Sequence, residues 1–266
     1  MARKQLAQRR PLATLDDFIR TYEWETSRPC KEGADFFEGK GILPLTYHNP
    51  HLNRLTFLIS WITWEGFLNN HYYAGITSKS EEDLQVIREI CQPLDLSLNV
   101  TDRRVGFSAH GSWYARLFSL LGCPQTECDT KGSHKITVPS YLKFLTAYYS
   151  NISGEDKIAA RQTLEAYIKP LLWCRLSDYT NPGRETTRIS LVSNRDPDHG
   201  EEHVVGLGRD IVKIFKKLYP KMHISSEDIH ASYCKNAWHG RITLRQEALA
   251  AGLHYRLFGL RLVKEI

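Results

Sequence analysis

Two histidines and a glutamate in the second half of the chain have the spacing of a possible zinc site. The segment His199-Gly200-Glu201-Glu202-His203 fits the pattern H-x-x-E-H, in which both histidines bind the metal and the glutamate acts as general base. The preceding Asp-Pro-Asp and the internal glycine favour a loop, however. We therefore expect these residues to be solvated, and keep a zinc metallopeptidase that uses His199, Glu202 and His203 as an alternative.

Other local signatures of catalysis are missing from the sequence. It contains no G-x-G-x-x-G for a dinucleotide, no P-loop for a nucleoside triphosphate and no G-x-S-x-G for a serine nucleophile. Six cysteines are scattered along the chain, which predicts reduced thiols and a reducing intracellular compartment, either the cytoplasm or nucleoid or an organelle matrix. No apolar run approaches the ~18 residues of a membrane helix, so no membrane partner is expected.

The charge balance permits a nucleic-acid partner without requiring one. The chain has 266 residues, with 35 basic and 30 acidic side chains and a net charge of +5. Basic residues gather near the N-terminus and again around a predicted helix that contains Lys213, Lys216 and Lys217. Such clusters attract phosphates, and they also occur as ordinary solvated helix faces. A hydrophobic content of 42% indicates a globular chain rather than a disordered one.

The elements that must position these residues occur in an order that repeats. The pattern of the first half predicts an apolar helix over 54–68, a strand over 72–78 and an amphipathic helix over 80–90. A hairpin over 96–109, a helix over 112–121 and a helix from 139 follow. The amphipathic helix begins at Ser80, a capping residue followed by three acids. The pattern of the second half predicts a similar order. It gives a helix over 158–176, a strand over 188–194 and a helix over 211–218. A hairpin of residues 222–226 and 229–234, a strand over 241–244 and a helix over 246–257 follow.

This repetition predicts an α/β (α+β) protein with two pseudo-symmetric halves. Residues 1–50 are expected to form an N-terminal extension, residues 51–150 the first repeat and residues 151–266 the second, with Ser153-Gly154 in the link between the repeats. The two repeats share the order of their elements rather than obvious sequence identity, so an internal duplication is inferred from the pattern.

The apolar helix of each half carries a related motif. Residues 58–66 read LISWITWEG and resemble the motif of the LAGLIDADG homing endonuclease family, because Leu, Ile and Gly match and Glu65 replaces the second Asp. Residues 171–179 read LLWCRLSDY, stand one repeat length later, and keep the leading Leu and the acid, Asp178. The segment that closes the first repeat, which contains Lys131, Lys135 and Pro139, also resembles this family.

The resemblance implies two LAGLIDADG-type αββαββα repeats with antiparallel DNA-binding sheets. In this family the two motif helices pack side by side, and each brings one carboxylate to the same point. Glu65 and Asp178 would then bind Mg²⁺ or Mn²⁺, hard cations that prefer oxygen ligands, for phosphodiester hydrolysis. Lys131 and Lys135 would stabilise the charged transition state at the first catalytic centre.

The implied function is a site-specific double-stranded DNA endonuclease that acts as a monomer. The alternative is a member of the same fold that binds DNA or structured intron RNA without cutting it, as an intron-splicing maturase or a regulator. Little chain separates Gly66 from the next predicted strand, so the first strand of the first repeat is expected to be short or absent. Such a reduced sheet would contact fewer base pairs.

Sequence recognition would come from polar residues that reach the major groove, where Arg and Asn can contact the edges of guanine and adenine. The candidates lie in or beside predicted strands: Lys79, Asn99, Arg103, Arg104, Asn194, Arg195, Lys235 and Arg241. Family helices carry small residues where they meet. Here Ser60 and Ser177 occupy two such positions, and each serine is expected to face a tryptophan of the other helix.

Overall fold

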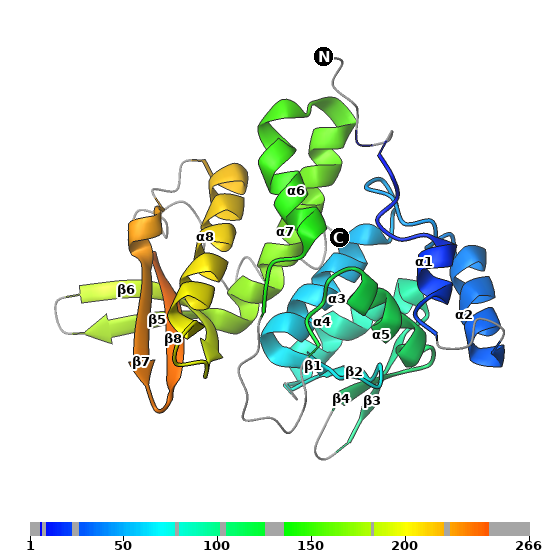
Figure 1. The fold of residues 1–266 in the computed structure, drawn as a ribbon, viewed down its shortest axis with the longest axis horizontal. Helices are drawn as coiled ribbons and strands as arrows, with labels where there is room; N and C mark the ends of the chain where they lie inside the picture. Colours follow the sequence, from blue (N-terminus) through cyan, green and yellow to red (C-terminus); the bar gives the residue numbers. More distant parts are fainter. Residues whose placement is uncertain are drawn as a thin grey trace.

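The computed structural model describes residues 6, 9–22, 27–77, 80–101, 105–125, 136–181, 184–220 and 224–244. The chain forms two halves in which the same kinds of element recur in the same order (Figure 1). No helix in these ranges is long and apolar enough to cross a membrane.

The first half contains a central helix, two short strands, a second helix, a hairpin and two closing helices: α3 (Leu52–Glu65), β1 (Gly66–Leu68), β2 (Ala74–Ile76), α4 (Glu81–Cys91), β3 (Ser97–Val100), β4 (Val105–Ser108), α5 (Gly111–Leu120) and α6 (Ser140–Tyr148). The second half contains a long central helix, two strands, a second helix and a hairpin: α7 (Gly154–Arg175), β5 (Leu176–Asn181), β6 (Arg184–Asn194), α8 (Gly200–Leu218), β7 (Ile229–Cys234) and β8 (Ala237–Leu244).

Each half contains one four-stranded antiparallel sheet. The strand orders are equivalent, β1-β2-β4-β3 and β5-β6-β8-β7. In both halves the first strand follows directly on the last residue of the central helix, and its first residue pairs with the second strand, Gly66 with Ile76 and Leu176 with Ile189. The predicted α/β class with two pseudo-symmetric halves is therefore confirmed, and β1 is short as expected. The predicted helix 246–257 lies outside the described residues.

One predicted hairpin is wrong. The sequence pattern paired residues 222–226 with 229–234, but Ser226–Asp228 forms a 3₁₀ turn. The hydroxyl of Ser225 accepts from the backbone of this turn, and Asp228 accepts from Ser225 in return, so local capping replaces strand pairing. Strand β7 pairs instead with β8, through a turn in which Lys235 and Asn236 both have positive φ, 49° and 60°. Residues 221–223 lie outside the described part of the chain.

The core of the molecule is the contact between α3 and α7 (Figure 1). Every residue of α3 from Leu55 to Trp64 is buried, as expected for a helix that is apolar on all sides. The buried Ser60 donates a hydrogen bond from Oγ to the backbone oxygen of Tyr167, 2.5 Å away. A small side chain at this point lets the two backbones approach closely. Ser60 thus contacts the α7 backbone, while Trp173 lies beside Trp61, with ring centroids 6.3 Å apart.

The N-terminal segment packs on the first half through aromatic side chains. Helices α1 (Leu15–Ile19) and α2 (Arg28–Gly39) bring Phe18 and Phe37 together at 4.9 Å, and Phe37 contacts Tyr114 of α5 at 5.1 Å. The guanidinium of Arg116 lies 3.9 Å from the rings of both Tyr22 and Tyr72, which joins the N-terminal segment to the β1–β2 hairpin by cation–π contacts.

Helices α6 and α8 join the two halves through a charged cluster. The carboxylate of Asp210 lies 2.9 Å from Lys143 of α6 and 3.0 Å from Lys213 of its own helix. Burial disfavours the charged carboxylate, but the hydrogen bonds and charges of the two lysines outweigh this effect and hold the pKa of Asp210 below its ordinary value. Asp210 is therefore ionised at neutral pH and links the repeats.

We predict that Asp210→Asn lowers the free energy of unfolding at pH 7 by about 1 kcal/mol, because a partly buried carboxylate loses its attraction to two exposed lysines. A carboxyl with a lowered pKa stabilises the fold above its ordinary pKa of 3.8 and loses this contribution as the pH falls further. Urea unfolding at pH 7 and pH 3 should therefore show a difference between variant and wild type that shrinks at pH 3. The control is Glu32→Gln in the exposed Arg28–Glu32 pair; a pH-independent difference for Asp210→Asn would contradict the prediction.

Candidate functional site

The two central helices end at a pair of opposite charges. Glu65 is the last residue of α3 and Arg175 is the last residue of α7, so the two occupy equivalent positions in the two halves. Arg175 Nη2 lies 3.3 Å from Glu65 Oε1, and both side chains are about one-third exposed, 30% and 31%. The same guanidinium nitrogen donates to the backbone oxygen of Trp64. An ion pair thus occupies the point where the resemblance places two carboxylates.

Residues around this ion pair fix its geometry. Thr77 donates from Oγ1 to Glu65 Oε2 at 3.1 Å, and its backbone N–H donates to the Glu65 backbone oxygen at 2.7 Å. On the other helix, the indole N–H of Trp173 donates to Asp83 Oδ1 at 2.6 Å. Burial raises the pKa of the Cys174 thiol, which therefore stays protonated at neutral pH. Thr77, the residue after β2, therefore orients the Glu65 carboxylate that pairs with Arg175.

Asp178 does not occupy the position equivalent to Glu65. The sequence pattern placed this acid at the foot of a helix running to residue 176, but α7 ends at Arg175 and Asp178 lies within β5, where its Cα pairs with that of Thr187. The apolar spacing of α7 continues into β5, so the end of the helix is decided by long-range pairing between β5 and β6 rather than by local sequence. The motif in the second half is therefore shifted relative to the predicted alignment.

The side chains described at the helix ends do not fit a divalent cation. Mg²⁺ and Mn²⁺ are held by several oxygen ligands, whereas the carboxylate of Glu65 faces the permanently charged guanidinium of Arg175. Across the described ranges no group of three His, Cys, Asp or Glu residues is placed to hold a metal ion. Lys131 and Lys135, expected to assist at the first centre, lie outside the described residues.

The predicted zinc pattern also forms no metal cluster. His199 is the N-cap residue of α8, and Glu202 and His203 lie in the first turns of this helix, so the expected loop is wrong from Gly200 onwards. Acidic side chains in the first turn interact favourably with the helix dipole, and this offsets the low helix propensity of Gly200. The amide of Asn194 donates to His203 Nδ1 at 3.0 Å, a contact that gives this histidine a structural partner.

The second sheet presents a polar, basic face to solvent. Residues that are paired across neighbouring strands lie on the same face of a sheet, and Arg241 pairs with both Ser190 and His230, all three exposed. One step along, His239 pairs with exposed Ser232. The other face is apolar: an added Cβ at Gly208 of α8 would lie only 2.8 Å from Ile229 of β7. Lys235 is exposed at the tip of the β7–β8 hairpin.

The first sheet carries a smaller polar face beside two aromatic rings. Asn99 is exposed and pairs with Gly106. A Cβ at Gly106 would lie 1.9 Å from the hydroxyl of Tyr73, so only glycine leaves room for this ring. Tyr73 in turn lies 5.7 Å from Phe67, between ring centroids. The first sheet therefore offers Asn99 and an exposed tyrosine ring on one surface.

The predicted DNA-contact residues fall into three groups. Asn99, Arg195, Lys235 and Arg241 are exposed, as a binding role requires. Asn194 is only 1% exposed and bonds to His203 and to the backbone of Asp196, so its role is structural. Three basic residues lie outside the described part of the chain: Lys79, Arg103 and Arg104.

Sequence reasoning missed three residues of these surfaces: Arg175, His230 and His239. The two histidines could have been found from the alternation of polar and apolar residues along β7 and β8. Arg175 has a weaker signal, since a basic residue at the end of a helix is favoured wherever the helix ends.

Comparison with known proteins gives a structural likeness but no match in sequence. No protein-family model matches the sequence, and no curated protein matches it. The fold is similar to a crystal structure of the N-terminal LAGLIDADG domain of DUF199/WhiA, with 13% sequence identity and a TM-score of 0.39, over 84% of this chain and 94% of that one.

We predict a favourable coupling between Glu65 and Arg175 of about 0.5–1 kcal/mol, the range of partly exposed ion pairs. The measurement is a double-mutant cycle of Glu65→Gln and Arg175→Met in the free energy of unfolding, at low and high salt. Salt should reduce the coupling because the pair is accessible to water. The exposed pair Arg28–Glu32 serves as the control and should show a smaller coupling. A coupling of zero at low salt would mean that the pair is not formed in solution.

Proposed function

We propose that this chain binds double-stranded DNA as a monomer, through the exposed polar faces of its two sheets, and does not cut it. Antiparallel strands can enter the major groove and present side chains to base edges. Two equivalent sheets beside a central helix pair would contact successive segments of one duplex. The proposal rests on the fold and on the side chains described above.

The observation that carries the proposal is the exposed face of the second sheet. Arg241 and His230 stand opposite each other on neighbouring strands, and Lys235 extends from the hairpin tip. Phosphate contacts by such residues supply affinity and depend on salt, whereas an arginine directed at guanine supplies specificity. Ser232 and His239 add hydrogen-bonding groups on the same face. The first sheet contributes Asn99, which can bind an adenine edge.

The ion pair at the helix ends supports the non-cutting part of the proposal. Two-metal hydrolysis of a phosphodiester needs carboxylates that draw cations to the scissile phosphate. Glu65 is already neutralised by Arg175 at 3.3 Å, and a nearby guanidinium disfavours a divalent cation by charge repulsion. Arg175 could instead attract a DNA phosphate to this point between the sheets. The endonuclease activity implied by the resemblance thus stays an untested alternative that requires Asp178.

We predict that Arg241→Ala/Lys235→Ala weakens duplex binding and makes it less dependent on salt. Each lost phosphate contact should reduce the slope of log K against log salt by about 0.9. The measurement is fluorescence anisotropy with duplexes selected by the wild-type protein from a randomised library, over a series of salt concentrations. The matched control is Arg28→Ala on α2, at the opposite end of the molecule from the second sheet (Figure 1), which should leave the slope unchanged.

The same selected duplexes test cleavage and the nature of the partner. With Mg²⁺ or Mn²⁺ present, the wild type should bind them without cutting. Cutting that disappears in Glu65→Gln or Asp178→Asn would establish the endonuclease alternative and contradict the non-cutting proposal. Structured RNA that displaces the duplex at lower concentration than competitor DNA would make RNA the partner. An equal loss of affinity in Arg28→Ala and Arg241→Ala/Lys235→Ala would show that binding is not located on the sheet.

A further inference from the structure

A pocket of about 710 Å³ lies between the N-terminal segment and helices α5 and α6. Its size is within the ~300–1,000 Å³ typical of small-molecule sites. Leu12 and Leu120 form apolar walls, and Tyr47 and Phe144 add aromatic rings. Figure 1 shows α1 and α6 above strands β1–β4, so the pocket is separate from the proposed DNA-binding faces.

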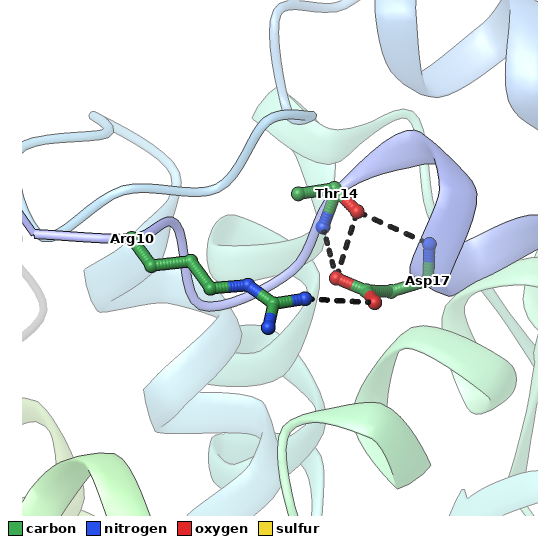
Figure 2. A network of polar contacts seen from close by, with 3 residues as sticks. All are labelled: Arg10, Thr14 and Asp17. Atoms are coloured by element: carbon green, nitrogen blue, oxygen red, sulfur yellow. Dashed lines mark hydrogen bonds and ion pairs between the residues drawn. The ribbon is translucent and has the colours of Figure 1, made fainter.

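Two arginines line the pocket and remain available to a ligand. The side chain of Arg10 is 79% exposed, and its guanidinium reaches Asp17 only at 3.5 Å, the limit of a hydrogen bond (Figure 2). Arg20 is also exposed, and its guanidinium makes no hydrogen bond or ion pair to another residue in the described part of the chain. Arginine binds phosphate oxygens through two parallel N–H donors. The pocket therefore has the donors that a phosphate group requires.

The pocket also carries an acceptor, which narrows the class of ligand. Figure 2 shows the Asp17 carboxylate held by Thr14 through one oxygen, Oδ2, with the Thr14 backbone N–H at 3.0 Å and its hydroxyl at 2.7 Å. These hydrogen bonds hold the pKa of Asp17 below its usual range, so the carboxylate stays charged. Within the described ranges, its other oxygen, Oδ1, makes only the long contact with Arg10. An anionic group placed against Oδ1 would be repelled, whereas an O–H or N–H group of a ligand would donate a hydrogen bond to this oxygen.

The aromatic side of the pocket suits a flat ring. The rings of Tyr47 and Phe144 lie 5.7 Å apart and 38° from parallel, and the guanidinium of Arg9 lies 4.6 Å from the Phe144 ring. Burial, opposed by the charge of Arg9, raises the pKa of Tyr47 to about 12. The Tyr47 hydroxyl therefore keeps its proton at neutral pH and can donate to a ring nitrogen or a carbonyl oxygen.

We propose that this pocket binds a nucleoside monophosphate, either free or as the 5′-phosphorylated end of a nucleic-acid strand. Arg10 and Arg20 hold the phosphate, Asp17 accepts from sugar or base donors, and the base lies against Leu12, Leu120 and Phe144. A nucleotide combines an anionic group, hydrogen-bond donors and a flat apolar ring, which are the three properties that the lining requires. The site does not depend on the sheets and is independent of the proposed duplex binding.

The test is isothermal titration calorimetry of the full chain with the four nucleoside 5′-monophosphates, their unphosphorylated nucleosides, inorganic phosphate, and trinucleotides with and without a 5′-phosphate. At least one monophosphate or phosphorylated trinucleotide should bind. Arg10→Gln and Arg20→Gln should each raise the Kd about tenfold or more, since each removes charge-assisted hydrogen bonds. Both side chains are exposed, so the variants should fold, which circular dichroism checks. Arg28→Gln is the matched control and should leave the Kd unchanged.

The results distinguish a free nucleotide from a strand end as the ligand, and they show whether the proposal fails. Tighter binding of the monophosphate indicates a free nucleotide, and tighter binding of the phosphorylated trinucleotide indicates a strand end; both support the proposal. No binding by any phosphorylated compound would overturn it. Binding of nucleosides or of inorganic phosphate as tight as that of the monophosphates would also overturn it, as would affinity unchanged in both pocket variants. Arg241→Ala/Lys235→Ala should bind mononucleotides like wild type, so a failure of the duplex proposal leaves this test intact.

Discussion

The close packing of α3 against α7 determines where the two sheets lie. Ser60 brings the two backbones within hydrogen-bonding distance, because its hydroxyl donates directly to the backbone oxygen of Tyr167. This contact lies less than one turn before Pro170, which removes a backbone N–H from α7 and disturbs its hydrogen-bond ladder. Each sheet begins at the residue after a central helix. The crossing of these two helices therefore fixes how the two sheets are placed relative to each other.

The same packing forces the last residues of the helices together, and their charges decide what this point can do. Two carboxylates at that separation would repel each other, and the fold would need a cation to be stable there. A glutamate and an arginine attract each other and satisfy the site without a metal. Arg175 also donates to the Trp64 backbone oxygen, so it caps the end of α3 as well as pairing with Glu65. An arginine at the end of α7 thus makes this point an attractive pair of charges rather than a repulsive one.

Local signals in the sequence predicted most of the fold and little of the site. Ser80 and the three acids after it define the start of α4, and in the structure the Ser80 hydroxyl accepts from the Asp83 N–H at 3.2 Å. The alternation in β3 and β4 and the apolar run of α3 were equally clear. The end of α7 was not, because Leu171, Leu172 and Leu176 fit both a helix and the strand that follows. The pairing of β5 with β6 decides that boundary, and it is invisible to local periodicity. Because this boundary was misplaced, Asp178 was expected opposite Glu65, where the structure has Arg175.

The pocket beside α6 is joined to the central helices, yet it should act independently of them. Tyr141, on the pocket wall, lies 3.0 Å from Thr56 of α3 through their hydroxyl groups, and α3 ends at Glu65. A ligand in the pocket could change DNA affinity only if these contacts had two arrangements with different affinities for it. Thr56, Ser60 and Tyr141 are buried and hydrogen-bonded. A close-packed interior of this kind has little room for a second arrangement of these side chains. The physical connection between the two sites is therefore a rigid support, and occupancy of each should leave the affinity of the other unchanged.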